Sequence, residues 1–215
     1  PPDGTAFGAF GAFGVGTART TTLVTGAVRS GKSRHAEDLL RDHSDVTYVA
    51  TGPRADSADP EWSRRVDAHR GRRPESWLTV ETADVPRVIA GATGPVLVDC
   101  LGTWLTAVAD DAGWDDLDAA SAAVRRQGAQ LVEALCTARV PVVVVTNEVG
   151  WSLVPTTASG RLFQDELGRL NALVAGVAAR VHLVVAGRGQ GAERQEQVAA
   201  AGVLRERTLR EQLAG

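Results

Sequence analysis

The feature that most constrains this chain is a segment near its N-terminus, residues 26–33, which reads Gly-Ala-Val-Arg-Ser-Gly-Lys-Ser. It fits the pattern G-x-x-x-x-G-K-S/T of the phosphate-binding P-loop. In this motif the glycines let backbone N–H groups turn toward a polyphosphate, the lysine reaches the β- and γ-phosphates, and the final hydroxyl ligates Mg2+. The motif predicts a nucleotide site formed by Gly26, Ala27, Val28, Arg29, Ser30, Gly31, Lys32 and Ser33.

Two further observations support a phosphate site. Residues 20–25 are typical of a strand and residues 33–40 of a helix, so the loop would lead into a helix N-terminus, which favours an anion. Of the 23 Lys and Arg residues only one is a lysine, and it is Lys32. Its compact ammonium on a flexible stem suits a position between phosphates better than a planar guanidinium does. The alternative is a glycine-rich turn that opens an ordinary helix.

Strand-like and helix-like segments alternate from residue 20 onward. Strands are expected at 20–25, 46–51, 77–81, 96–100, 140–146 and 181–186, and helices at 33–40, 59–70, 85–90, 116–138 and 159–179. Continuous apolar runs such as 96–100 are typical of strands that are covered on both faces of a sheet. The pattern predicts an α/β fold with a mostly parallel sheet, helices on both faces and a ligand crevice at the carboxyl ends of the strands.

The length of 215 residues is typical of one domain. Residues 1–19 contain a short Gly-Ala-Phe repeat without periodicity, and we expect a disordered N-terminal extension there. A clip onto a neighbouring subunit is the alternative. The P-loop domain is expected to span 20–188. Residues 189–215 change from Gly-rich to charged helix formers, which predicts a C-terminal helical tail.

Composition argues against several classes of partner. A net charge of −3 gives no indication of nucleic-acid binding, and no apolar run approaches the length of about 20 residues needed to span a membrane. Cys100 and Cys136 lie in apolar surroundings without a metal-like spacing. They are typical of core residues in a reducing compartment, so we expect a cytoplasmic protein.

Asp99 ends the apolar strand expected at 96–100, which is the Walker B pattern. A carboxylate at this position can hold Mg2+, directly or through water, opposite Ser33. Ser33 and Asp99 are therefore the candidate metal ligands. The alternative is a strand-end aspartate that caps the following segment.

Two other segments carry candidate chemistry. The segment 69–74, His-Arg-Gly-Arg-Arg-Pro, has the highest density of basic residues in the chain, and the neutral imidazole of His69 can act as a nucleophile near pH 7. A basic helix end with a surface histidine is the alternative. Residues 146–150, Thr-Asn-Glu-Val-Gly, follow a run of valines, which indicates a loop that faces a site.

Taken together, these segments resemble the bifunctional adenosylcobinamide kinase / adenosylcobinamide-phosphate guanylyltransferases of cobalamin synthesis. The resemblance covers about residues 20–188, in order and without large gaps. The P-loop alone is shared by many proteins, whereas the Thr-Asn-Glu-Val-Gly segment and the histidine spacing are specific. The matching segments are 23–37, 48–51, His69 with Arg73, Pro74, Trp77 and Glu81, 98–101, 146–150 with Val154 and Pro155, and 168–171.

The resemblance implies two reactions. A nucleoside triphosphate first phosphorylates the aminopropanol hydroxyl of adenosylcobinamide; a histidine then attacks the α-phosphate of GTP and passes GMP on to the phosphorylated cobinamide, which gives adenosylcobinamide-GDP. His69 matches the guanylylated position, and Lys32 is the second catalytic candidate. GTP and ATP are the expected nucleotides, with Mg2+. Besides the P-loop, the matching nucleotide contacts are Ala50, Thr51, Gly52, Arg70, Gly71, Arg72, Arg73, Glu81 and Asp99.

The resemblance further implies a RecA-like P-loop NTPase fold and a homotrimer. One departure concerns Ala27, where the family usually has glycine, because an alanine would be strained there if the position required a positive φ. Two alternatives remain open: a P-loop small-molecule kinase that does not use His69, and a nucleotide-binding module without turnover.

Overall fold

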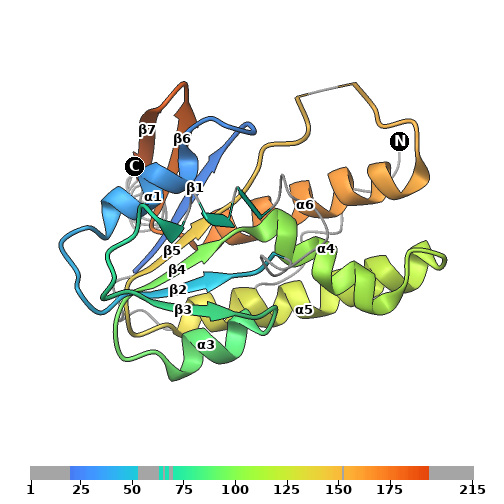
Figure 1. The fold of residues 1–215 in the computed structure, drawn as a ribbon. Helices are drawn as coiled ribbons and strands as arrows, with labels where there is room; N and C mark the ends of the chain where they lie inside the picture. Colours follow the sequence, from blue (N-terminus) through green and yellow to red (C-terminus); the bar gives the residue numbers. More distant parts are fainter. Residues whose placement is uncertain (1–19, 53–62, 65, 68–69, 152, 194–215) are drawn as a thin grey trace, which may run out of the picture.

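The computed structural model describes residues 20–52, 63–64, 66–67, 70–151 and 153–193. Its centre is a seven-stranded sheet with the strand order β3-β2-β4-β5-β1-β6-β7 (Figure 1). All neighbouring strands pair in parallel except β6 and β7, which are antiparallel. The strands are β1 (Thr21–Gly26), β2 (Thr47–Ala50), β3 (Leu78–Glu81), β4 (Val96–Asp99), β5 (Val142–Val145), β6 (Arg180–Val185) and β7 (Arg188–Glu193).

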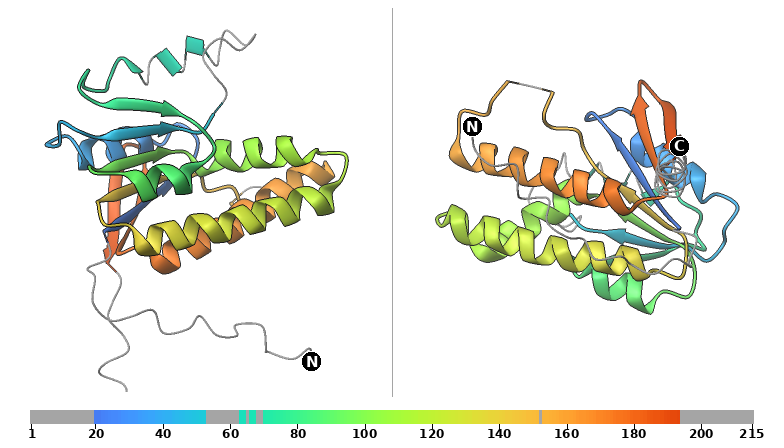
Figure 2. Two further views of the ribbon diagram at one scale, coloured as in Figure 1. Left: turned by 90° about the horizontal axis from the view of Figure 1, so that it is seen from below. Right: turned by 180° about the vertical axis from the view of Figure 1, so that it is seen from behind.

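Helices cover both faces of this sheet, as the alternating pattern predicted. Helices α3 to α6 lie on one face, where α5 and α6 run side by side, and α1 lies on the other (Figures 1 and 2). The helices are α1 (Lys32–Leu39), α3 (Val85–Gly91), α4 (Leu101–Ala112), α5 (Leu117–Thr137) and α6 (Ala158–Val177). None of the helices in the described ranges has the length and hydropathy of a membrane-spanning segment.

Alternation of side chains along the central strands explains why helices are needed on both faces. In β1, Leu23 belongs to the larger core, beneath α3 to α6, whereas Val24 belongs to the smaller core, beneath α1. In β4, Val98 belongs to the larger core and Leu97 to the smaller one, and all four side chains are at most 2% exposed. A strand that is apolar on both faces buries its side chains only between two helical layers.

Side-chain caps fix two of the helices at the positions that the sequence indicated. Asp84 precedes α3 and accepts a hydrogen bond from the backbone N–H of Arg87. Asp116 does the same for α5 through the N–H of Ala119. Each carboxylate satisfies a backbone donor that has no partner inside the helix. These caps account for the close agreement between the predicted and observed starts of α3 and α5.

The sequence interpretation missed two elements. Helix α4 follows β4 directly, and its apolar residues Leu101, Trp104, Leu105 and Val108 recur with helical spacing. Strand β7 occupies residues that were expected to begin a helical tail, so the predicted boundary at residue 188 falls inside the sheet. The remainder of the predicted tail, the N-terminal extension and most of the helix expected at 59–70 lie outside the described residues.

A tight turn explains why β7 forms from a glycine-rich segment. Ala186 and Gly187 connect β6 to β7 and have positive φ values of 50° and 80°, as a two-residue hairpin turn requires.

A pair of histidines packs against β7. His35 and His182 share a hydrogen bond of 2.8 Å between their rings, and a side chain on Gly189 would collide with the His35 ring. Burial lowers the pKa of His182, which favours its neutral form and keeps a ring nitrogen available as an acceptor.

Candidate active site

The P-loop connects β1 to α1, and its backbone explains the positions of its glycines. Gly31 has a φ of 91°, and a Cβ on Gly26 would lie 2.5 Å from the carbonyl oxygen of Val184. The other positive φ in the loop belongs to Arg29, at 60°, and not to Ala27. The alanine at position 27 is therefore unstrained, and the departure from the usual glycine does not distort the loop.

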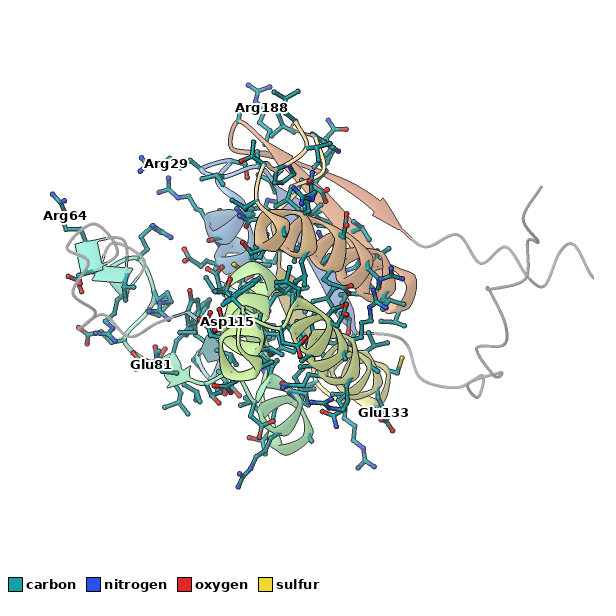
Figure 3. All side chains as sticks on the ribbon, turned by 90° about the vertical axis from the view of Figure 1, so that its right-hand side faces the viewer. Arg29, Arg64, Glu81, Asp115, Glu133 and Arg188 are labelled. Atoms are coloured by element: carbon teal, nitrogen blue, oxygen red, sulfur yellow. The ribbon has the colours of Figure 1, made fainter. Side chains whose placement is uncertain are left out.

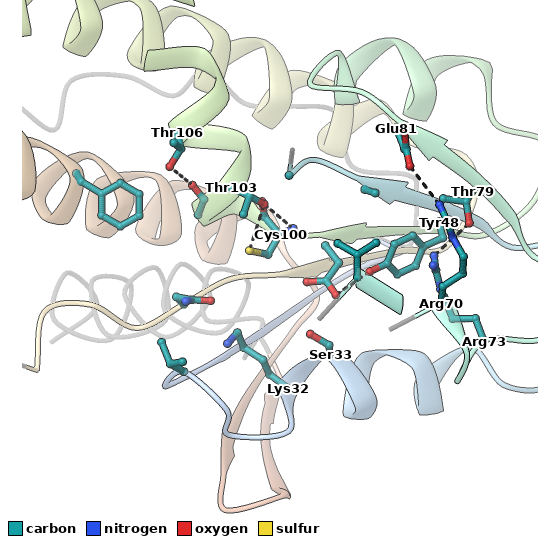
Figure 4. Close-up of a pocket in the computed structure, with 18 residues that line it drawn as sticks. Lys32, Ser33, Tyr48, Arg70, Arg73, Thr79, Glu81, Cys100, Thr103 and Thr106 are labelled. Atoms are coloured by element: carbon teal, nitrogen blue, oxygen red, sulfur yellow. Dashed lines mark hydrogen bonds and ion pairs between the residues drawn. The ribbon is translucent and has the colours of Figure 1, made fainter. Parts of the chain in front are cut away.

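Lys32 begins α1 and is 7% exposed. Its Nζ donates a hydrogen bond of 3.2 Å to the carbonyl oxygen of Ala27, which folds the side chain back across the loop. Lys32 and Ser33 both line a cavity at this edge of the sheet (Figure 4). Arg29, in contrast, extends outward from the loop (Figure 3). The loop thus directs one cation toward the cavity and another toward solvent.

Strand register places three predicted contacts in one row across the sheet. Ala50 pairs with Glu81 on β3 and with Asp99 on β4, and each is the last residue of its strand. Because the carboxyl ends of parallel strands meet at the same edge, the row lies on the side where β1 enters the P-loop. The sheet therefore brings together residues that are up to 49 positions apart in the sequence.

Asp99 is held by an aromatic partner. The hydroxyl of Tyr48 donates a hydrogen bond of 2.9 Å to its Oδ2, and the guanidinium of Arg73 stacks over the Tyr48 ring at 3.6 Å from the centroid. Arg73 also donates to the hydroxyl of Thr79 at 3.2 Å. Burial is the main cause that raises the pKa of Tyr48 and lowers that of Arg73, and the Tyr48 phenol remains a neutral donor. Asp99 is thereby fixed in orientation.

The arginines of the basic segment that follows position 69 make two different kinds of contact. Arg70 lies 3.3 Å from the carboxylate of Glu81, and both line the cavity. Arg72 instead makes a two-pronged ion pair with Glu37 on α1, with N–O distances of 3.1 and 3.2 Å. This arrangement fits a structural role for Arg72, which connects the segment to α1. His69 lies outside the described residues.

The cavity has a volume of about 280 Å3. It brings together the predicted residues of the P-loop, of the three strand ends and of the basic segment (Figure 4). The predicted residues that line it are Val28, Lys32, Ser33, Ala50, Gly52, Arg70, Arg73, Glu81 and Asp99. Those that belong to the same segments but do not line it are Gly26, Ala27, Arg29, Ser30, Gly31, Thr51, Gly71 and Arg72.

One wall of the cavity comes from α4, which the sequence interpretation missed. The hydroxyl of Thr51 donates to the carbonyl oxygen of Cys100 at 2.7 Å and lies 2.7 Å from the hydroxyl of Thr103. Thr103 accepts from the backbone N–H of Cys100 at 3.3 Å and closes the start of the helix. Burial raises the pKa of the Cys100 thiol, so this cysteine is a neutral wall residue. Helical apolar spacing after Asp99 was the signal for this wall.

The loop after β5 forms another part of the wall, as the polar triplet predicted. Asn171 on α6 accepts from the hydroxyl of Thr146 at 2.6 Å and donates to the carbonyl oxygen of Asn147 at 3.0 Å. Glu148 accepts from the hydroxyl of Thr25 at 2.5 Å, and its backbone N–H donates to the carbonyl oxygen of Gly26. These bonds join the loop to the start of the P-loop, and Asn147 faces the cavity.

Known proteins resemble this chain over most of its length. Residues 22–191 match the family model "Cobinamide kinase / cobinamide phosphate guanyltransferase". The bifunctional adenosylcobalamin biosynthesis protein CobU of Escherichia coli is 40% identical over 177 residues, which cover 78% of this chain and 96% of that protein. CobU of Salmonella typhimurium is 36% identical over 178 residues, covering 78% and 96%. CobP of Pseudomonas aeruginosa is 38% identical over 174 residues, covering 77% and 92%.

A solved structure, the P4 protein from bacteriophage phi6 in complex with ADP, has a TM-score of 0.38 and 15% identity to this chain, covering 83% of this chain and 56% of that one. The family match spans nearly all of the described sheet, from residue 22 in β1 to residue 191 in β7, and includes every segment that contributes to the cavity. The chain belongs to the cobinamide kinase / cobinamide phosphate guanyltransferase family.

Proposed function

We propose that this protein phosphorylates the aminopropanol hydroxyl of adenosylcobinamide and then transfers GMP from GTP, through a guanylylated histidine, to give adenosylcobinamide-GDP. The observation that carries this proposal is the single cavity that joins the P-loop residues Lys32 and Ser33 to the strand-end carboxylates Glu81 and Asp99. Family membership supplies the substrate class. An α/β P-loop enzyme with one such cavity can bind a nucleoside triphosphate in both steps.

Phosphoryl and nucleotidyl transfer both require neutralisation of charge on phosphate oxygens. Lys32 and Arg73 supply fixed cations at the cavity. Ser33 and Asp99 offer hard oxygen ligands, which fit Mg2+, with phosphate oxygens and water to complete its coordination. The bond from Tyr48 orients the Asp99 carboxylate at the cavity, where it could ligate a metal ion or its water. When bound, the ion would polarise the transferring phosphate.

The second reaction requires a nucleophile, and the proposal assigns this role to His69. Neutral imidazole attacks the α-phosphorus of GTP, a P–N bond forms, and pyrophosphate leaves with the electron pair of the broken P–O bond. The imidazole loses its remaining ring proton to water. A phosphate oxygen of the phosphorylated cobinamide then attacks the same phosphorus and takes GMP. The imidazole leaves with the electron pair of the P–N bond and regains a ring proton from water. Arg70, which follows His69 directly in the sequence, lines the cavity, and this supports the assignment.

The test uses the full chain with Mg2+ and GTP labelled at either the α- or the γ-phosphate. We expect label from the α-phosphate alone to become protein-bound, acid-labile and alkali-stable, as a phosphoramidate is. The His69→Ala variant should lose this label while it still binds GTP. Wild-type protein that takes up no label but phosphorylates adenosylcobinamide would favour the kinase-only alternative. Binding of nucleotide without either product would favour the module without turnover.

Glu81 is proposed to select guanine. Its carboxylate can accept from the guanine N1–H and 2-amino groups, which adenine does not offer as a pair, and Arg70 holds it at the cavity. In the Glu81→Gln variant the preference for GTP over ATP should fall about 10- to 100-fold, because hydrogen bonds to a charged group are strong. Competition between the two nucleotides for guanylylation or binding measures this change. Glu75→Gln, an exposed glutamate outside the cavity, is the control, and an unchanged preference in Glu81→Gln would refute the assignment.

The remaining expectations belong to the same proposal. The use of ATP beside GTP and the homotrimer follow from the family resemblance, and the cytoplasmic location follows from the cysteine usage. Cys100 and Cys136 are both free thiols, which fits a reducing compartment.

A further inference from the structure

The cavity has two ends, and the nucleotide accounts for only one of them. Figure 4 shows Arg70, Thr79 and Glu81 on one side of Lys32, and Thr103 and Thr106 on the other. The first end carries the charged groups proposed to bind the nucleoside. The lining around Thr103 and Thr106 is uncharged, because Gly102 lies in the same turn of α4 and the tip of the Phe163 ring lies next to Gly102. Val28 and Asn147 are further uncharged residues of the lining.

The geometry of phosphoryl transfer gives the second end a role. The attacking oxygen and the leaving oxygen lie roughly in line through the transferred phosphorus. With Glu81 holding the base and Lys32 holding the phosphates, the acceptor must approach from the side of Lys32 opposite the base. That side is the uncharged end. From this we infer that Thr106, Asn147 and Phe163 bind the aminopropanol arm of the corrinoid acceptor, an inference that rests on the proposed function.

The chemistry of this end matches that arm, which carries a secondary alcohol, a methyl group and an amide. The hydroxyl of Thr106 donates to the carbonyl oxygen of Gly102 at 3.1 Å, so its oxygen lone pairs can accept from an amide N–H. The side-chain amide of Asn147 can both donate and accept. The tip of the Phe163 ring lies 3.8 Å from where a Cβ on Gly102 would be, which puts an apolar surface beside the first turn of α4 for the methyl group.

This end is rigid before any ligand binds. Thr106 and Phe163 lie on α4 and α6, and Asn171 holds the backbone of Asn147 through a hydrogen bond of 3.0 Å. The cavity volume of about 280 Å3 is at the lower limit for a site that holds a drug-sized ligand. The polyphosphate also occupies part of this volume. The remaining space fits the aminopropanol arm, and the corrin macrocycle therefore stays outside the cavity.

The test compares Thr106→Val and Phe163→Ala with wild-type protein. In the kinase reaction the KM for adenosylcobinamide should rise about three- to tenfold for Thr106→Val, which loses one hydrogen-bond acceptor, and at least about tenfold for Phe163→Ala. The KM for the nucleotide and the guanylylation of the protein by GTP, which requires no corrinoid, should not change. The Kd for adenosylcobinamide without nucleotide, measured by equilibrium dialysis with the absorbance of the corrinoid, should rise in parallel.

Thr137→Val is the matched control, because Thr137 makes the same type of intrahelical bond on α5, to the carbonyl oxygen of Glu133 at 3.0 Å, away from the cavity. Thermal unfolding identifies any variant that fails to fold. Valine has nearly the same shape as threonine, so Thr106→Val should fold and remain informative even if Phe163→Ala does not. Active wild-type protein with an unchanged KM and Kd in Thr106→Val would overturn the inference and leave the proposed function intact. Wild-type protein that forms neither product would overturn both.

Discussion

Replacement of Lys32 by alanine should reduce both the phosphorylation of adenosylcobinamide and the guanylylation of the protein by at least about a hundredfold. Lys32 is the only lysine in the chain, and it lies at the cavity between the P-loop and the strand ends. In the structure its Nζ donates a hydrogen bond of 3.2 Å to the carbonyl oxygen of Ala27, and phosphate oxygens would replace this partner. Both reactions depend on the same cation because both use the same P-loop.

Rates of product formation and of label uptake from α-labelled GTP measure this effect separately for the two reactions. Lys32→Arg should not restore either activity, because a planar guanidinium does not fit the position of a compact ammonium. Arg126→Ala, which removes an exposed cation on α5, serves as the control for a change in net charge. A Lys32→Ala variant that keeps one reaction within tenfold of wild type would show that the P-loop serves only the other.

Most of the sheet was predictable from the sequence, because the local sequence pattern of its strands agrees with their packing in the folded protein. The runs at β4 and β5 are continuous and apolar, as strands between two helical layers must be, and Asp84 and Asp116 cap their helices with their own side chains. Strand β7 could not be predicted in this way. Its glycines are poor strand formers, and they are accommodated because the His35 ring occupies the space above Gly189. The contact between His35 and Gly189 exists only in the folded chain, so the sequence does not indicate it.

The candidate site also contains residues that were predictable from the sequence and residues that were not. The P-loop and Asp99 were predicted from motif and spacing, because phosphate chemistry requires those residue types at those distances, whereas Glu81 was predicted from the family resemblance. The pairing of Arg72 with Glu37 was not foreseeable, since a guanidinium in a basic segment fits phosphate and carboxylate equally well. Thr106 and Phe163 carry no motif at all. They meet at the cavity only because α4 and α6 pack on the same face of the sheet.

Trp104 on α4 should contribute more to stability than any other single side chain that the structure describes. It is the largest fully buried side chain, and its indole N–H donates to the carbonyl oxygen of Ala83 at 2.8 Å. Trp104→Ala should lower the free energy of unfolding by about 3–5 kcal/mol, through lost apolar burial and the cavity left behind. This is a large share of the total of about 5–15 kcal/mol that is typical of a domain.

Urea denaturation of three variants separates packing from hydrogen bonding. Trp104→Phe keeps most of the apolar volume but removes one of two donors to the carbonyl oxygen of Ala83, which still accepts from the backbone N–H of Val85 at 2.9 Å. The loss of this one hydrogen bond should cost about 0.5–1.5 kcal/mol. Trp151→Ala is the control, because that side chain is 73% exposed and its loss should change stability by less than about 0.5 kcal/mol. Equal losses in Trp104→Ala and Trp151→Ala would contradict the packing described for α4.

The same bond has a consequence for the site. Trp104 directly follows Thr103, and Ala83 lies two residues after Glu81, so the indole connects the α4 wall of the cavity to the strand end that carries the proposed guanine contact. Trp104→Phe should therefore raise the KM for GTP in guanylylation even at temperatures where the variant is fully folded. An unchanged KM would mean that β3 holds Glu81 in place without help from α4.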